Sequence, residues 1–305
     1  MVETFIRCVL SMRQFFRLFL IFLCLSFPGA LAYAQDAGKA APAKAEPVVS
    51  PPPMPHVPNF WDPQALVDKP ARRIVSIRFL TSPEFPPFNF IAPDGRLSGF
   101  NVDLARAICE QLSAECTIQL RPFGELQKAL EENRGDAIVA GIGISAESRK
   151  AFGFSHIYLR FPARFVAQKG TAITATADGL ADKWVAVVAG TAHEAYLQAF
   201  FGDALVASYK STDEALEALK SGKVDAYFGD GMTLGFWLGG EKAGGCCVFA
   251  GGPYLDASYF GQGMAVAMAP GNTALRTAVN YALRRLHESG RYEELYLRYF
   301  PVSFF

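Results

Sequence analysis

The chain has 305 residues, a formal net charge of zero, 51% hydrophobic residues and 19% charged residues. This length is sufficient for two compact units of about 100 residues or more. The balanced charge offers no basic surface of the kind that nucleic-acid binding requires, so we expect no nucleic-acid partner. Beyond the N-terminus, no apolar stretch reaches the roughly 18 residues that a membrane-spanning helix needs.

The first 34 residues have the pattern of a secretory signal peptide. Three arginines precede an apolar run at residues 18–27, and Ala32 and Ala34 are the small residues that a signal peptidase reads. We therefore predict cleavage after Ala34 and a periplasmic location, with translation starting at Met1 or Met12. An uncleaved membrane anchor is the alternative interpretation of the same segment.

Export would place the cysteines in an oxidising compartment, where they commonly pair. Four cysteines remain after the predicted cleavage, and Cys109 and Cys116, seven residues apart, form the natural pair. The adjacent Cys246 and Cys247 could be free thiols, bonded to each other or bonded elsewhere. The four histidines have no ligand spacing with these cysteines, so we expect no metal site and no cofactor.

Residues 35–72 are rich in alanine and proline and poor in large apolar side chains. Such a segment buries too little surface to fold and is expected to be an extended, disordered tether.

From residue 73 onward, strands and helices alternate. We expect strands at residues 74–80, 116–120 and 136–141, separated by helices at residues 99–112 and 123–132. This order is a βαβαβ unit, which predicts a parallel sheet with crossover helices.

A second series of alternating elements follows the first. The expected strands are 161–167, 183–188, 204–209 and 224–228, with helices at 193–201 and 212–221. A strand at 264–268 and a long helix at 273–289 come last. These last elements have no partner sheet unless they return to the first unit.

The stretch from Asp136 to Tyr158 has the features of a binding site. An apolar strand turns through Gly141 and Gly143 and leads to Arg149. Backbone N–H groups and a guanidinium can converge there on a carboxylate, because the planar guanidinium binds both carboxylate oxygens. A strand, a turn and a solvated arginine form the alternative interpretation, since turn motifs are weak evidence.

Several further segments follow in a recognisable order along the chain. They include FPPFNF at 85–90, DGRLSGFNVDLARAI at 94–108, GDAIVAGIGIS at 135–145, VVAGTAHEAY at 187–196, ALEALKSGKVDAYFGD at 215–230 and YFGQGMAVAM at 259–268. In this order and spacing they resemble the family 3 periplasmic solute-binding proteins, the polar-amino-acid receptors of ABC importers. The resemblance runs from about residue 74 to the C-terminus. Some basic-amino-acid receptors of this family also carry a disulfide where Cys109 and Cys116 stand.

The resemblance implies an α/β fold of the two-lobed, type II periplasmic-binding-protein kind, with mostly parallel sheets and a two-strand hinge. Lobe one would comprise residues 73–161 and 264–305, lobe two residues 162–258, and the hinge residues 259–263. Ligand would be held in the cleft between the lobes.

The implied function is capture of a polar or neutral α-amino acid, or a similar small acid, by hinge closure. The implied partner is an ABC permease in the inner membrane, and we expect a monomer without enzymatic activity. One alternative is a ligand-poor accessory or sensor-type protein of the same fold, associated with quinoprotein dehydrogenases. A less favoured one is an enzyme resembling cyclohexadienyl dehydratases, with Glu84, Glu147 or His193 transferring protons.

An α-amino acid carries a carboxylate and an ammonium, and both charges need partners when a closed cleft excludes water. The resemblance implies Arg149 for the carboxylate and Asp230 for the ammonium. A turn aspartate at a strand end is the alternative for Asp230. The usual arginine position of the family falls one residue earlier, on Ser148, so Arg149 carries a one-residue shift. Arg160 and Arg164 are the fallback candidates.

Two aromatic positions, Phe85 and Phe123, are implied to sandwich the side chain of the ligand, with ordinary core packing as the alternative. Ser82 stands where receptors for cationic amino acids often carry aspartate. That substitution argues against a strongly basic ligand, although the nearby Glu84 keeps the question open.

Backbone N–H groups complete the implied site. Gly141 and Gly143 replace the hydroxyl residues of many relatives, so only their N–H groups could meet the ligand carboxylate. Gly190, Thr191 and Ala192 would approach the same carboxylate from lobe two, at a helix N-terminus that favours anions.

Overall fold

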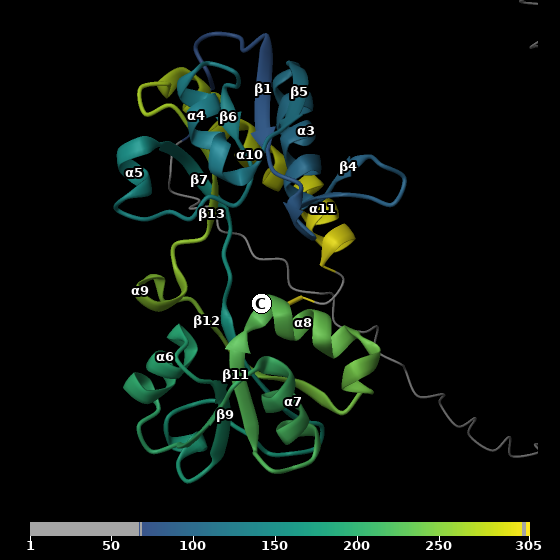
Figure 1. Ribbon diagram of the computed structural model, residues 1–305, viewed down its shortest axis with the longest axis vertical. Helices are drawn as coiled ribbons and strands as arrows, with labels where there is room; N and C mark the ends of the chain where they lie inside the picture. Colours follow the sequence, from purple (N-terminus) through teal and green to yellow (C-terminus); the bar gives the residue numbers. More distant parts are fainter. Residues whose placement is uncertain (1–66, 68, 301–302) are drawn as a thin grey trace, which may run out of the picture. The chain divides into compact units, whose positions relative to one another are not determined.

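The computed structural model describes residue 67, residues 69–300 and residues 303–305. The predicted signal peptide and most of the predicted tether therefore lie outside the described residues. Two five-stranded sheets with helices packed on them make up this part of the chain (Figure 1). Within the described ranges, no helix is both long enough and apolar enough to cross a membrane.

The first sheet has the strand order β5-β1-β6-β13-β7. Its strands are β5 (Glu115–Leu120), β1 (Ser76–Thr81), β6 (Ala137–Ile138), β13 (Met264–Met268) and β7 (Gly153–Leu159). The strand β1 pairs in parallel with β5 and β6, whereas β13 runs antiparallel to β6 and β7. The helices of this part are α3 (Phe100–Leu112), α4 (Leu126–Glu131), α5 (Ser148–Ala151), α10 (Thr273–Glu288) and α11 (Arg291–Tyr299), with a 3-10 turn η1 (Phe123–Glu125).

A small three-stranded sheet follows β1 in the chain. It consists of β2 (Glu84–Phe85), β3 (Asn89–Ile91) and β4 (Leu97–Ser98).

The second sheet has the order β10-β9-β11-β8-β12. Its strands are β10 (Leu205–Tyr209), β9 (Trp184–Val188), β11 (Ala226–Asp230), β8 (Ala163–Gln168) and β12 (Cys247–Tyr254). Here β9 pairs in parallel with β10 and β11, and β8 runs antiparallel to β11 and β12. The helices are α6 (Ala192–Phe200), α7 (Thr212–Lys220), α8 (Gly231–Gly239) and α9 (Ala257–Phe260), with 3-10 turns η2 (Asp178–Leu180) and η3 (Glu241–Ala243).

The predicted βαβαβ unit is confirmed, since β1, α3, β5, α4 and β6 occur in this order, with the small sheet inserted between β1 and α3, and β1 pairs in parallel with β5 and β6. The predicted strand at 136–141 is shorter than expected. It ends as β6 at Ile138, before the chain turns at Gly141, where φ is +75°. The strand β13, predicted at 264–268, has those bounds and lies within the first sheet.

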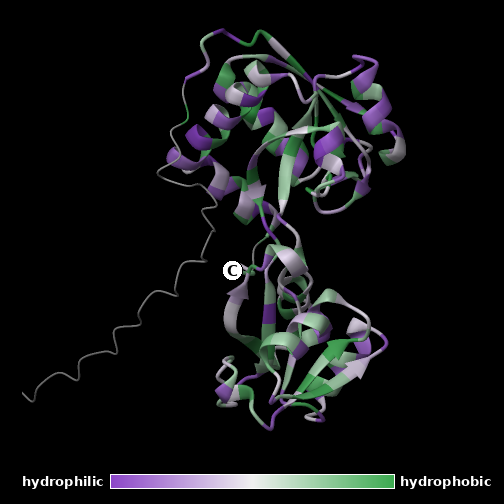
Figure 2. Ribbon diagram, turned by 90° about the vertical axis from the view of Figure 1, so that its left-hand side faces the viewer, coloured by the Kyte–Doolittle hydropathy of each residue, from purple (hydrophilic) through white to green (hydrophobic). Residues whose placement is uncertain are grey.

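The strands of both sheets contribute buried hydrophobic side chains to the core. All five residues of β13 are buried, as are five of the six in β8. Figure 2 shows hydrophobic colour along the strands, whereas hydrophilic and hydrophobic colours alternate along the helices. This pattern is expected for buried strands covered by amphipathic helices.

The described residues contain two disulfides. Cys109 near the end of α3 is bonded to Cys116 in β5, which confirms the predicted pair. Cys246 and Cys247 are bonded to each other, so the vicinal bond is the arrangement found among the possibilities left open by the sequence.

The chain connects the two sheets between β7 and β8, and again between β12 and β13. The C-terminal segment makes a further contact. Phe304 is buried in the same core cluster as Tyr296, and its carbonyl oxygen would lie 3.2 Å from a Cβ added to Gly231, the first residue of α8. The division of the chain into lobes, with the bounds given above, stays a prediction.

Candidate ligand-binding site

Most of the predicted site residues follow the carboxyl ends of parallel strands. In the first sheet, Ser82 follows β1, Phe123 follows β5 and Gly141 comes shortly after β6. In the second sheet, Thr191 follows β9 and Asp230 ends β11. Ligands of open α/β sheets bind outside this edge, so the topology supports a site here.

A cavity of about 190 Å³ lies at this edge of the second sheet. It brings together two predicted residues, Thr191 and Asp230. The full lining is Val188, Thr191, His193, Thr212, Tyr227, Phe228, Asp230, Thr233 and Leu234. Ala192, also predicted from this side, is exposed next to Thr191.

Asp230 is held in place by the helix that follows it. Its Oδ1 accepts hydrogen bonds from the backbone N–H of Thr233 at 2.8 Å and from the Thr233 hydroxyl at 2.7 Å, which makes it the N-cap of α8. No described residue donates to Oδ2. One carboxylate oxygen therefore fixes the orientation, while the other is left for a cationic group.

Thr191 has the corresponding role at the start of α6. Its hydroxyl donates to the Val188 carbonyl at 2.7 Å and accepts from the N–H of Glu194 at 3.3 Å. The N–H of Gly190 donates to Glu194 Oε2 at 2.7 Å, so this predicted carboxylate donor is already engaged. Among the described residues, the N–H groups of Thr191 and Ala192 have no acceptor. They are the donors that remain at this helix N-terminus.

His193 lies between two aromatic rings in the same cavity. Its imidazole stacks on Phe260 at 5.1 Å and meets Phe228 edge-on at 5.8 Å between ring centroids. Burial lowers the pKa of His193, and the negative charge of Asp230 opposes this shift. The sequence indicated His193 only as a possible proton-transfer residue.

Among the polar lining residues, sequence reasoning missed Thr212, Tyr227 and Thr233. Thr233 could have been found, because a helix start with Asp at the N-cap directs the residue three positions later back to the cap. Thr212 and Tyr227 come from other elements, and no spacing pattern links them to Asp230.

On the first sheet, Arg149 is exposed on the short helix α5. Its Nη2 donates to Gln262 Oε1 at 2.8 Å, and its guanidinium carbon lies 5.8 Å from the ring centroid of Phe154. Ser148, at the usual arginine position of the family, is used differently. Its hydroxyl donates to the Gly143 carbonyl at 2.8 Å and accepts from the N–H of Ser145 at 2.9 Å. Ser148 thus closes the turn, and Arg149 is the residue presented beyond it.

Gly141 and Phe85 are in close contact. A Cβ added to Gly141 would lie 2.6 Å from Phe85 Cε1, closer than real atoms approach, so the ring packs where only glycine fits. A Cβ added to Gly143 would have no neighbouring atom within 4 Å. Phe123 is 53% exposed, and Ser82 is 2% exposed with its carbonyl accepting from Asn89 Nδ2 at 2.5 Å.

The two fallback arginines have different surroundings. Arg164 is buried, with its guanidinium carbon 4.3 Å from the Phe249 ring centroid and its Nε donating to the Gly251 carbonyl at 3.0 Å. Burial lowers the pKa of Arg164. Arg160 is half-buried. Arg149 is therefore the most exposed of the three candidates.

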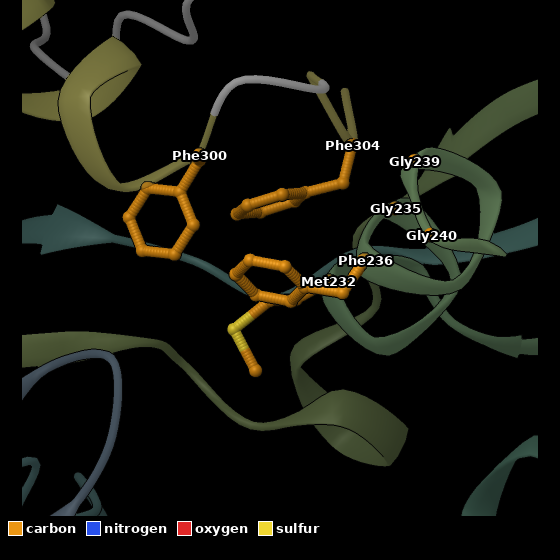
Figure 3. Close-up of a pocket in the computed structure, with 7 residues that line it drawn as sticks. All are labelled: Met232, Gly235, Phe236, Gly239, Gly240, Phe300 and Phe304. Atoms are coloured by element: carbon orange, nitrogen blue, oxygen red, sulfur yellow. The ribbon is translucent and has the colours of Figure 1, made fainter.

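The structure thus brings Thr191 to Asp230 and Phe85 to Gly141. It contains no contact between Arg149, on α5 between two strands of the first sheet, and Asp230, in β11 of the second sheet. A separate apolar cavity of about 120 Å³ lies between α8 and the C-terminal segment (Figure 3). Met232, Phe236, Phe300 and Phe304 point toward one another there, and none of the predicted ligand-binding residues lines it.

Known proteins resemble this chain over most of its length. The ABC transporter arginine-binding protein 1 of Escherichia coli K12 is 34% identical over 225 residues, which cover 74% of this chain and 90% of that protein. The L-arginine-binding protein of Pseudomonas aeruginosa is 32% identical over 221 residues, covering 72% of this chain and 85% of that protein.

Solved structures show the same fold. The L-cystine solute receptor of Neisseria gonorrhoeae has a TM-score of 0.64 at 19% identity, over 75% of this chain and 94% of that one. This likeness supports the two-lobed α/β fold, and the predicted fold class is confirmed. The sequence model of the bacterial extracellular solute-binding proteins, family 3, matches residues 77–302, and the chain therefore belongs to this family.

Proposed function

We propose that this protein is the periplasmic substrate-binding protein of an ABC importer and that it captures a polar α-amino acid. The observation that carries this proposal is the pairing of Asp230 with Thr191 in one cavity at the carboxyl edge of the second sheet. Relatives from Escherichia coli K12 support it, since they include arginine-binding and lysine/arginine/ornithine-binding proteins. The names of these relatives likewise support the ABC permease partner and the periplasmic location.

The two charged ends of the ligand would have different partners. Its ammonium would bind Oδ2 of Asp230, the oxygen that α8 does not use. Its carboxylate would bind Arg149 and the N–H groups of Thr191 and Ala192. Arg149 would then exchange the neutral amide of Gln262 for a carboxylate, and charge-assisted hydrogen bonds are roughly twice as strong as neutral ones.

The side chain of the ligand would lie near Phe85 and Phe123. Ser82 has a neutral hydroxyl and therefore offers no charge to a cationic side chain. It is also buried, and its carbonyl is bonded to Asn89. Glu84 is exposed next to Phe85 and could pair with one. L-arginine and L-glutamine, which differ in side-chain charge, are therefore the two informative test ligands.

Binding accounts for these residues better than catalysis does. Of the three proton-transfer candidates, only His193 lines the cavity. Glu147 is exposed and paired with Lys150 at 2.7 Å, and Glu84 belongs to the small sheet next to β1. We therefore assign no reaction to the site.

The test combines a thermal-shift screen of the twenty common amino acids with calorimetric titration of L-arginine and L-glutamine. Arg149→Ala and Asp230→Ala should each weaken binding roughly 30-fold or more, because losing one partner of a buried charge costs about 2–5 kcal/mol. The double variant should lose less than the sum, since both residues act through one ligand.

Lys150→Ala is the matched control for Arg149, because it removes a neighbouring exposed cation that pairs with Glu147. This variant should bind normally. Normal binding by Arg149→Ala would move the carboxylate partner to Arg160 or Arg164. Normal binding by Asp230→Ala as well would refute the amino-acid assignment.

A further inference from the structure

His193 and Asp230 line the same cavity but are contributed by different elements, α6 and β11. The imidazole is fixed from two directions by the rings of Phe260 and Phe228. The field of the Asp230 carboxylate reaches this imidazole, since it opposes the lowering of the pKa of His193. A proton gained by His193 would therefore act on the carboxylate that is proposed to hold the ligand.

Other titratable groups on the neighbouring elements are engaged or neutral. On α6 itself, the Glu194 carboxylate accepts from Gly190 and from the hydroxyl of Ser208. At the start of α9, Asp256 accepts from the N–H of Ser258 at 2.8 Å.

The phenols of Tyr227 and Tyr196 do not add a charge. Burial raises the pKa of Tyr227, which lines the cavity from β11, and also that of Tyr196 on α6. Tyr259 of α9 packs edge-on against Tyr196, at 5.2 Å between ring centroids. Among the described residues, no lysine or arginine lines the cavity. Near neutral pH, the groups of the cavity lining that can carry a charge are thus the Asp230 carboxylate and the His193 imidazole.

We propose that His193 is a positioning residue that makes amino-acid capture depend on pH by controlling access to Asp230. A neutral imidazole leaves the Asp230 carboxylate to the ligand ammonium. A protonated imidazole attracts that carboxylate and repels the ammonium. This inference rests on the proposed function, because it concerns the same site.

The direction of the effect follows from the charges. Because burial lowers the pKa of His193, the imidazole is neutral at neutral pH and gains its proton only under acidic conditions. Affinity should be fully developed above this pKa and should fall as the pH drops through it. Linkage is reciprocal, so bound ligand should lower the pKa of His193 further.

The experiment is calorimetric titration of the full chain between about pH 5 and pH 7.5, the range in which histidines titrate. The probe is L-arginine or L-glutamine, whichever binds better, and neither changes its charge in this range. The dissociation constant of the wild type should rise about fivefold or more toward acidic pH, a size typical of coupling between two sites. His193→Gln should remove this dependence, so that its dissociation constants at the two ends of the pH range agree with each other.

His156→Gln is the matched control, because burial also lowers the pKa of His156, which lies in β7 of the first sheet. It should retain the full pH dependence of the wild type. A pH dependence that survives His193→Gln, or one that is lost in His156→Gln, would overturn the proposal.

A second measurement needs no variant. The imidazole proton resonances of His193, followed by NMR with and without the probe, should titrate at a lower pH in the bound protein. An unchanged or raised pKa on binding would refute the inference. If none of the twenty amino acids binds at about pH 7.5, the proposed function and this inference are both overturned. If an amino acid binds with an affinity that does not depend on pH, only the inference is overturned.

Discussion

Gly141 and Gly143 look alike in the sequence but differ in their surroundings. Gly141 has a φ of +75° and packs against Phe85, whereas Gly143 has open space where a Cβ would be. Gly141→Ala should lower the free energy of unfolding by at least about 1–2 kcal/mol, the cost of a left-handed conformation for an L-residue. It should also weaken amino-acid binding, because the Phe85 ring must move.

Gly143→Ala is the matched control and should change neither property appreciably. Denaturant unfolding and calorimetric titration of both variants are the measurements. Equal effects at the two positions would show that the contact with Phe85 has no role in the site.

At the level of residues, the sequence was informative wherever a functional group ends a strand. Asp230 and Thr191 could be predicted because each follows a strand within a recognisable segment, and both line one cavity. The partner of Arg149 could not, since Gln262 is 113 residues away and only the folded chain brings them together. Thr212 escaped prediction for the same reason, because loops that follow different strands converge without any spacing in the sequence.

At the level of elements, the two disulfides constrain the chain differently. Cys109–Cys116 links α3 to β5 across a separation of seven residues, whereas Cys246–Cys247 joins neighbours. Closing a loop of this length should stabilise the fold by about 2–3 kcal/mol through the entropy of the unfolded chain. Cys109→Ala combined with Cys116→Ala should lose this stability in denaturant unfolding.

The matched comparison is Cys246→Ala combined with Cys247→Ala. This pair closes almost no loop, so its loss should be clearly smaller. A larger loss from the vicinal pair would mean that packing around Cys247, which is buried, outweighs the chain-entropy effect.

The element predictions succeeded where hydrophobic periodicity is regular and failed where it is broken. The strand at 264–268 is five consecutive buried residues, so its bounds were predictable. The strand β12 was missed, because it contains Gly251, Gly252 and Pro253, which normally signal a turn. The strand β7 was also missed, since its residues were assigned to the segment that follows Arg149.

At the level of the whole molecule, the two proposed ligand partners come from different parts of the fold. Arg149 lies on α5, between two strands of the first sheet, and Asp230 lies in β11 of the second sheet. Neither Arg149 nor Asp230 alone neutralises both ends of an amino acid, so binding should draw the two sheets together. Small-angle scattering should show a smaller radius of gyration when L-arginine or L-glutamine, whichever binds, is saturating. The Arg149→Ala, Asp230→Ala double variant should show no change at the same concentration. Compaction that persists in the double variant would mean that closure does not depend on this charge pair.

The contact between α8 and the C-terminal segment bears on the speed of such a movement. Gly231, Gly235 and Gly239 recur every four residues, and the last two line the cavity with Phe300 and Phe304. Helix faces with large side chains form ridges that interlock with a neighbour, but glycines form none. Met232 and Phe236 project from α8 beside these glycines, and the ring centroids of Phe236 and Phe300 lie 6.1 Å apart, so large side chains do interlock at this contact. A movement that separates α8 from the C-terminal segment must repack these rings, and we expect this contact to slow the opening and closing of the protein.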